Sequence, residues 1–367
     1  MDRIINNTPY TLMKKSILLV LTICFSYVGI SQEYFPKNDG VKETNTLYTA
    51  FTNATLFISP TQKINNATLL IKEGKVVATG KNISIPGNTV VIDLDGKFIY
   101  PSFIDLYTDF GVEKPKRPSG ARRSPQYSAS REGFYWNDHI MPEKNAIDSF
   151  KYDTKTAGAM RHEGFGVVNT HHMDGIARGT GLLVALNDQG NEAMRIIDDA
   201  TSQHYSFAKS VTSRQSYPGS LMGAMALLRQ VYQDADWYTK GNIVTKDRSL
   251  EALLKNKSNV SIFEAGNKTN NLRADKIGDQ FGINYIIVGG GDEYEMIQQT
   301  KASDASFIIP LNFPDAYDVS NPYMANYISL EDMRAWNQAP TNPKALQDNG
   351  VPFALTTFKS KKPKDFS

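Results

Sequence analysis

Residues 67–105 read ATLLIKEGKVVATGKNISIPGNTVVIDLDGKFIYPSFID, and this stretch decides the fold. Short apolar and β-branched runs alternate in it with turn sequences such as Glu73-Gly74-Lys75 and Asp95-Gly96-Lys97. Runs of four or five residues punctuated in this way are typical of short strands joined by tight turns. The same pattern extends back to Leu47, so we predict a small antiparallel β module over residues 47–101.

Beyond Pro101 the pattern lengthens, starting with an apolar strand at Phe103–Tyr107. Apolar strands then alternate with amphipathic helices, which indicates a parallel sheet, closed or doubly wound, over residues 102–367. The remaining predicted strands are Gly166–Thr170, Thr180–Leu186, Val260–Phe263, Tyr285–Val288, Phe307–Pro310 and Pro352–Thr356. The predicted helices are Thr154–Glu163, Ser220–Ala235, Leu250–Lys255, Asn271–Phe281, Asp292–Thr300, Ser329–Trp336 and Asn342–Asn349. Residues 113–145 form a long basic insertion, which is either a solvated loop or a lid.

The N-terminal residues resemble an export signal. Lys14 and Lys15 precede a mostly apolar run over residues 16–30, and small residues lead to a cleavage site after Ser31. The run is short of the roughly 20 residues that a membrane-spanning helix needs. We therefore predict a signal peptide at 1–31, a flexible lead-in at 32–46, and export to the periplasm or cell envelope, with a membrane anchor as the alternative. Lipidation at Cys24 is disfavoured because Ile23 is not small.

The composition excludes several classes of protein. Hydrophobic residues make up 41% and charged residues 21% of the 367 residues, which is globular rather than disordered or multi-spanning. Lys and Arg number 40 against 38 Asp and Glu, so there is no basic field to attract nucleic acid, and we expect no nucleic-acid partner. The single cysteine rules out a disulfide framework and a CxxC zinc site.

Several segments carry a resemblance to a known family. Asp93, Gly96, Pro101 and Phe103-Ile104-Asp105 match the DxxGxxxxPGFID segment that leads into the barrel of the metal-dependent amidohydrolase superfamily. Most of residues 50–357 resembles secreted, imidazolonepropionase-like amidohydrolases, through segments such as RGTGLLVAL, SYPGSLMGAMALLRQ and NPKALQDNGVPFALTT. The resemblance implies an α/β fold: a TIM-like (β/α) barrel of the metal-dependent hydrolase type with a small N-terminal β-sandwich module. It also implies hydrolysis of C–N bonds other than peptide bonds, in small or cyclic amides, with Zn or another divalent metal.

The resemblance implies His-x-His at the end of the first barrel strand, histidines after the fifth and sixth strands, and an aspartate base after the eighth. This sequence has Tyr107-Thr108-Asp109, Phe263-Glu264-Ala265, Gly289-Gly290-Gly291 and Thr356-Thr357-Phe358 at those positions. The position of the base is Phe358. We therefore expect the fold without the family's metal site, and no cofactor held by this chain.

Other residues are weaker candidates. Asp109 and Glu264 could form an oxygen-rich site for Ca²⁺ or Mg²⁺, or could pair with the basic insertion or cap a helix. His171 and His172 are further candidate metal ligands at a strand end, and at most one can face the barrel mouth because neighbours on a strand point to opposite faces. Arg178 could orient a substrate carboxylate, or form a surface ion pair.

Two further segments have a structural and a functional interpretation. The glycine run before Asp292 predicts a tight turn between strand and helix rather than an anion site. The aromatic segment after the seventh strand could line a groove or a partner surface, although ordinary packing is favoured; it contains Tyr317, Tyr323, Tyr327 and Trp336.

These observations give a first hypothesis and two rivals. The first is a degenerate or fragmentary amidohydrolase unit, truncated near its eighth strand. Its partners would be a small-molecule amide substrate, if it is active, and a second amidohydrolase unit that completes the fold. The main alternative is an exported, non-enzymatic barrel that binds a ligand or a partner protein. A third hypothesis is an active hydrolase with a rebuilt carboxylate site at Asp109 and Glu264.

Overall fold

The computed structural model describes residues 47–119, 127, 131–188, 192–241 and 245–360. The predicted signal peptide, the lead-in and part of the basic insertion lie outside the described residues. Among the helices within those ranges, none has the length and apolar character to cross a membrane.

The N-terminal module is one five-stranded sheet. Its strands are β1 (Tyr48–Ser59), β2 (Gln62–Lys72), β3 (Lys75–Gly80), β4 (Thr89–Asp93) and β5 (Phe98–Ile99). Strand β1 pairs antiparallel with β2 and parallel with β4 and β5, in the order β3-β2-β1-β4. The prediction of an antiparallel module is therefore wrong in its second half, because residues 81–88 carry the chain across the sheet instead of forming a hairpin. A second sheet layer, and thus the predicted sandwich, is not confirmed by these strands.

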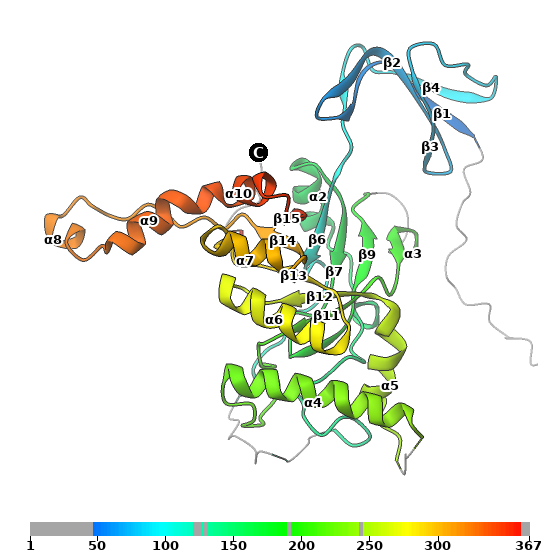
Figure 1. Ribbon diagram of the computed structural model, residues 1–367. Helices are drawn as coiled ribbons and strands as arrows, with labels where there is room; N and C mark the ends of the chain where they lie inside the picture. Colours follow the sequence, from blue (N-terminus) through cyan, green and yellow to red (C-terminus); the bar gives the residue numbers. More distant parts are fainter. Residues whose placement is uncertain (1–46, 120–126, 128–130, 189–191, 242–244, 361–367) are drawn as a thin grey trace, which may run out of the picture. The chain divides into compact units, whose positions relative to one another are not determined.

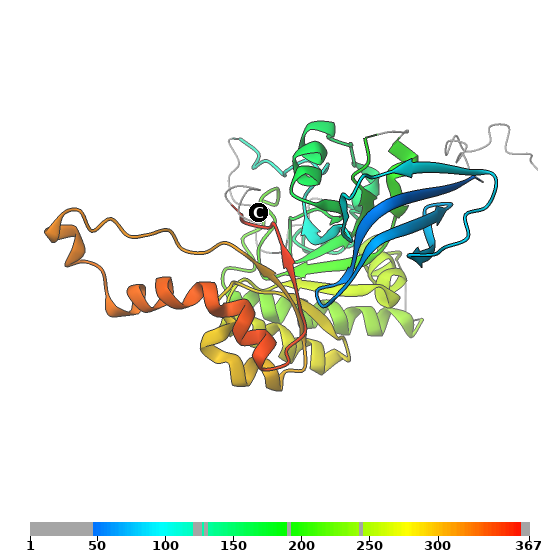
Figure 2. The same ribbon diagram turned by 90° about the horizontal axis from the view of Figure 1, so that it is seen from above.

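The following α/β region contains two sheets (Figures 1 and 2). The first has the order β10-β9-β7-β6, and the second the order β15-β14-β13-β12-β11-β8, parallel from β11 to β15. The strands are β6 (Phe103–Thr108), β7 (Phe165–Thr170), β8 (Ala177–Thr180), β9 (Leu182–Ala185), β10 (Ile196–Asp198), β11 (Ser202–Ser206), β12 (Val260–Glu264), β13 (Tyr285–Val288), β14 (Ser306–Pro310) and β15 (Phe353–Thr356).

The helices mostly connect these strands. They are α2 (Thr154–His162), α3 (Glu192–Arg195), α4 (Leu221–Thr239), α5 (Arg248–Lys255), α6 (Lys268–Phe281), α7 (Ile297–Ala302), α8 (Pro322–Ala325), α9 (Leu330–Gln338) and α10 (Asn342–Asp348). Short 3₁₀ turns are η1 (Ala146–Asp148), η2 (Asn256–Ser258), η3 (Glu293–Met296) and η4 (Ala339–Thr341). The side-chain oxygens of Ser220, Asp247 and Asn267 cap the N-termini of α4, α5 and α6, and so fix where these helices begin.

The two sheets are joined at both edges. Residues 177–185 form one extended stretch, whose first half (β8) pairs antiparallel with β11 and whose second half (β9) pairs antiparallel with β7. At the other edge, Thr356 Oγ1 donates to Asp105 Oδ1 (2.7 Å), and the Thr357 amide donates to Asp105 Oδ2 (3.0 Å). Asp105 thus links β6 to β15 by side-chain hydrogen bonds. The backbone ladders of the described residues remain two sheets, so a continuous closed barrel is not confirmed.

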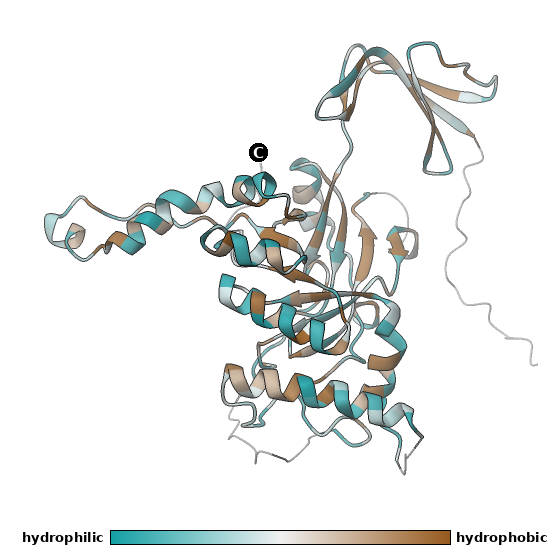
Figure 3. Ribbon diagram, in the orientation of Figure 1, coloured by the Kyte–Doolittle hydropathy of each residue, from teal (hydrophilic) through white to brown (hydrophobic). Residues whose placement is uncertain are grey.

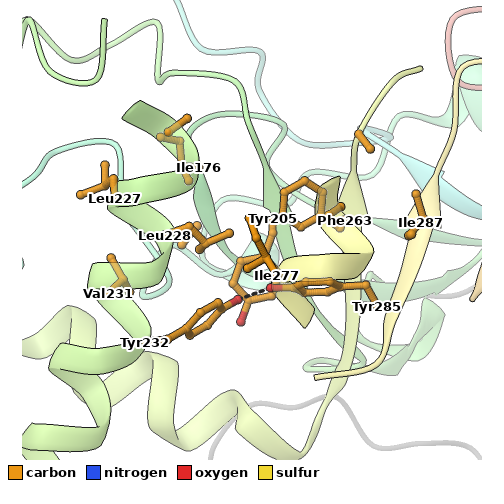
Figure 4. Close-up of a cluster of buried hydrophobic side chains, with 14 of the residues drawn as sticks. Ile176, Tyr205, Leu227, Leu228, Val231, Tyr232, Phe263, Ile277, Tyr285 and Ile287 are labelled. Carbon is orange, nitrogen blue, oxygen red and sulfur yellow. Dashed lines mark hydrogen bonds between the residues drawn. The ribbon is translucent and has the colours of Figure 1, made fainter. Parts of the chain in front are cut away.

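The main core lies between the six-stranded sheet and helices α4 and α6 (Figure 4). Leu227, Leu228 and Val231 on α4 are fully buried and pack with sheet residues such as Phe263 and Ile287. Burying such side chains contributes on the order of 1.5–3 kcal/mol each. Figure 3 shows strands such as β9 and β13 as hydrophobic and the helices striped, with hydrophilic residues among the apolar ones. This amphipathic pattern is the one that made the helices predictable.

Most predicted elements are confirmed, with some differences. The strand predicted at Thr180–Leu186 is β9 (Leu182–Ala185), and the strand before it, β8 (Ala177–Thr180), is not predicted by the pattern, nor are the short helices α3 and α8. The predicted helix at Asp292–Thr300 is η3 followed by the short α7. Strands β10 and β11 were not predicted, and β11 (SQHYS) is buried throughout although four of its five residues are not strongly apolar.

Candidate functional site

A buried polar cluster lies on the face of the six-stranded sheet opposite α4. Arg178 Nη2 contacts Glu264 Oε2 at 2.9 Å, and Arg178 Nη1 donates to the Tyr107 hydroxyl at 2.8 Å. That hydroxyl in turn donates to Glu264 Oε2 at 2.8 Å. The three side chains thus form a closed triangle of hydrogen bonds, which we call the Arg178 triad.

Three strands hold the Arg178 triad together. Tyr107 is on β6, Arg178 on β8, and Glu264 is the last residue of β12. Alternation along β12 places Phe263 in the core under α4, while Ile262 packs with Tyr107 on the opposite face. Glu264 shares the parity of Ile262 and therefore meets Tyr107 as well.

Burial and charge together set the protonation of the triad. Burial on its own raises the pKa of Glu264, but the Arg178 guanidinium and the hydrogen bonds from Tyr107 and Arg178 outweigh it, so the pKa is lowered. Burial raises the pKa of Tyr107 well above its ordinary value. The triad therefore contains a carboxylate, a guanidinium and a neutral phenol at neutral pH. The positive charge beside the Glu264 carboxylate is that of the Arg178 guanidinium.

Two stacked histidines lie beside the triad. The rings of His171 and His204 are parallel within 7°, with centroids 3.6 Å apart, and both side chains are fully buried. Nε2 of His171 lies 3.4 Å from Arg178 Nη1, and Nε2 of His204 lies 2.8 Å from Ser202 Oγ. Burial lowers the pKa of both rings well below the ordinary value, and the nearby Arg178 lowers it further. Both rings are therefore neutral.

The position of the family's base is apolar. Phe358 packs edge-on against the Tyr107 ring, with centroids 4.8 Å apart. A phenyl ring neither accepts a proton nor ligates a metal, so this position has a packing role.

The candidate metal ligands do not form a common site. Asp109 is paired with Lys114 of the basic insertion at 3.2 Å, as the structural interpretation predicted, and Glu264 is held by Arg178. His171 points into the buried cluster, whereas His172 bonds Ser149 instead. Within the described ranges, no three His, Cys, Asp or Glu side chains are grouped closely enough to hold a metal ion.

The residues of this pocket thus do not fit the metal of the amidohydrolase superfamily. A metal cation would have to share Glu264 with a guanidinium 2.9 Å away. The resulting repulsion inside a buried site opposes metal binding. No hydrolytic step through a metal-bound water is derived from this chain.

The interpretation of Arg178 as a surface ion pair is wrong. Arg178 is 2% exposed and is paired with Glu264 inside the molecule. Its Nε donates to the Gly175 carbonyl at 3.1 Å, and its Nη atoms donate to Tyr107 and Glu264. Orientation of a substrate carboxylate by Arg178 stays a prediction.

The glycine run is confirmed as a tight turn. Glu293 Oε1 accepts hydrogen bonds from the amides of Gly290 (2.8 Å) and Gly291 (3.4 Å), so the chain's own carboxylate occupies the place of an anion. A Cβ at Gly289 would lie 2.0 Å from that oxygen. The turn therefore requires glycine for space.

The prediction that the aromatic segment packs against the rest of the protein is wrong. Helices α8 and α9 have no buried residues, and Tyr323, Tyr327 and Trp336 are 78%, 85% and 44% exposed. The hydrophobic groups of this segment face solvent in the described chain.

A cavity of about 500 Å³ opens next to the triad. Arg178 and Gly179 lie in its wall, together with His172, Ser149 and Lys144. The basic insertion contributes Lys114 and Lys116 to the same wall. This cavity is the space available to a small ligand on this side of the sheet.

Comparisons with known proteins indicate the fold. No protein-family model matches the chain, and no curated protein matches it. An amidohydrolase from Thermotoga maritima MSB8 has a similar structure, with a TM-score of 0.61 and 18% identity over 87% of this chain and 80% of that one. A β-aspartyl dipeptidase from Fervidobacterium islandicum AW-1 matches 85% of this chain and 72% of its own, with 12% identity and a TM-score of 0.37. A guanine deaminase from C. acetobutylicum matches 84% of this chain and 74% of its own, also with 12% identity and a TM-score of 0.37.

The match with a TM-score above 0.5 is an amidohydrolase, which agrees in fold with the family that the sequence resembles. At these identities the likeness is one of fold. The fold is therefore a mixed α/β fold of the amidohydrolase, TIM-barrel type.

Sequence reasoning missed part of the site. The sequence pattern does not predict that Tyr107 and His204 lie together in a buried polar cluster. The available signal was the alternation of Ser202, His204 and Ser206 in β11, where polar residues repeat every second position. Hydrophobic periodicity does not detect a strand of that kind.

Proposed function

We propose that this chain is a degenerate unit of the amidohydrolase fold that does not itself carry out metal-dependent hydrolysis of C–N bonds. The observation that carries the proposal is the Arg178 triad, in which an arginine occupies the carboxylate that a metal would need. Hydrolysis of small or cyclic amides remains the activity of its kin. In this proposal that activity belongs to a second amidohydrolase unit acting with this chain.

The substitutions at the ligand positions support the proposal independently of one another. Tyr107 is neutral and hydrogen-bonded, Phe358 is apolar, and the glycine run is closed by Glu293. Asp109 is paired with Lys114, which weakens the hypothesis of a rebuilt carboxylate site. Each position that would ligate a metal has acquired a structural partner.

The test is to purify the chain from medium supplemented with Zn²⁺ or Mn²⁺ and to measure metal content and hydrolysis of cyclic amides and dipeptides. We expect well under one metal per chain, no metal-dependent turnover, and the same metal content in Glu264→Gln. Stoichiometric zinc that survives dialysis, falls in Glu264→Gln and supports turnover would refute the proposal.

A further inference from the structure

A serine and a histidine are hydrogen-bonded in the wall of the 500 Å³ cavity. Ser149 Oγ lies 2.9 Å from His172 Nε2. Ser149 is exposed and directly follows the 3₁₀ turn η1, whereas His172 lies two residues beyond β7 and is half-buried. A hydroxyl within hydrogen-bond reach of an imidazole is the basic unit of serine-based nucleophilic catalysis.

The ring nitrogen of His172 that faces Ser149 is Nε2. A neutral imidazole that carries its proton on Nδ1 accepts a proton at Nε2. The pair therefore has the orientation that proton transfer from Ser149 to His172 requires.

The segment that carries Ser149 is fixed against the sheet. Asn145 Oδ1 accepts from Thr180 Oγ1 at 3.0 Å, and a Cβ at Gly179 would lie 1.6 Å from the Lys144 carbonyl oxygen. Strand β8 therefore packs directly on residues 144–145, and the absence of a side chain at Gly179 permits this approach. The geometry of the pair is thus set by the fold.

The cavity can admit a small substrate to the pair. Ser149 and His172 share its wall with the apolar Met141 and with Lys144, whose ammonium brings positive charge close to the imidazole. A volume of about 500 Å³ is in the range of small-molecule sites. Positive charge near the nucleophile stabilises the oxyanion that forms when a carbonyl is attacked.

We propose that Ser149 and His172 are the nucleophile and the general base for hydrolysis of small carboxylic esters. Ser149 Oγ forms a bond to the ester carbonyl carbon while its proton moves to His172 Nε2. The C–O bond to the alcohol then breaks, and the alcohol leaves with that proton. Water attacks the acyl-serine, gives a proton to His172, and the carboxylic acid leaves as Ser149 is re-protonated. Esters are favoured over amides because an ester carbonyl is more electrophilic and an alkoxide leaves more readily than an amide anion, so ester cleavage depends less on proton donation by His172.

This proposal is independent of the metal question, and its test is run in chelator. The purified chain is treated with a fluorophosphonate probe and, separately, with p-nitrophenyl acetate, each in EDTA. We expect the probe to label Ser149, identified by peptide mass, and ester hydrolysis that is abolished by the label. Ser149→Ala and His172→Gln should each lower the rate of hydrolysis about a hundredfold or more.

Matched variants separate chemistry from folding. Ser303→Ala and His162→Gln alter a serine and an exposed histidine that lie outside the cavity wall, and should leave labelling and hydrolysis unchanged. All variants should retain the unfolding temperature of the parent chain. Absence of labelling, labelling at another residue, or equal rates in His172→Gln and the parent would overturn the proposal.

Discussion

The Arg178 triad makes a prediction about stability that can be worked from the structure. In Arg178→Met the side chain keeps its approximate length, but Glu264, which is 19% exposed, loses its counter-charge. Breaking a buried ion pair by removing one partner costs about 3–5 kcal/mol. The Tyr107 hydroxyl still donates to Glu264, so we expect the lower end of this range, about 3 kcal/mol.

The double variant Arg178→Met/Glu264→Gln tests the origin of that cost. If the cost comes from an uncompensated charge, neutralising Glu264 in the same molecule restores part of the stability. The two single effects should then exceed the double effect by about 1–3 kcal/mol. Chemical unfolding followed by circular dichroism at pH 7 measures all three free energies.

The control is Arg334→Met, which removes an exposed arginine on α9 and should change the unfolding free energy by no more than about 0.5 kcal/mol. The reasoning is refuted if Arg178→Met is as stable as the parent chain, or if the two single effects add fully in the double variant.

Two further predictions concern pH and packing. His139, His171 and His204 are buried and neutral; burial lowers the pKa of His139 to about 4 and those of the other two well below the ordinary value. The unfolded chain binds protons on these rings at a higher pH than the folded chain does. The free energy of unfolding is therefore largest above about pH 6.5 and falls as the pH decreases below it, by about 1.4 kcal/mol per pH unit for each ring. Unfolding free energies between pH 7.5 and 5 measure this dependence. A pH-independent free energy of unfolding would contradict the prediction. Gly179→Ala places a Cβ 1.6 Å from the Lys144 carbonyl oxygen and should lower the free energy of unfolding by about 1–3 kcal/mol. The control is Gly219→Ala, whose Cβ meets no atom within 4 Å and which should keep the melting temperature of the parent chain. Equal melting temperatures of the two variants would show that residues 144–145 can move away freely.

The exposed segment of α8 and α9 shows a limit of sequence patterns. Tyr323 on α8 and Trp336 on α9 have the residue types of a core, yet these two helices bury no side chain in the described chain. Local sequence gives the amphipathic character of a helix, but it does not say whether a surface is present to cover the apolar face. That depends on which elements the rest of the chain brings nearby.

The strands and helices of this protein, and their order along the chain, can be predicted from the amino-acid sequence wherever one face is apolar. Strands such as β12 and β13 and helices such as α4 and α6 have a period that matches their geometry, because hydrophobic burial acts on local pattern. The sequence also shows that the histidine expected at Tyr107 and the aspartate expected at Phe358 are absent. The contacts that the replacing side chains make follow only from the tertiary structure. Tyr107, Arg178 and Glu264 are separated by up to 157 positions along the chain, and their hydrogen bonds exist only because β6, β8 and β12 converge on one face.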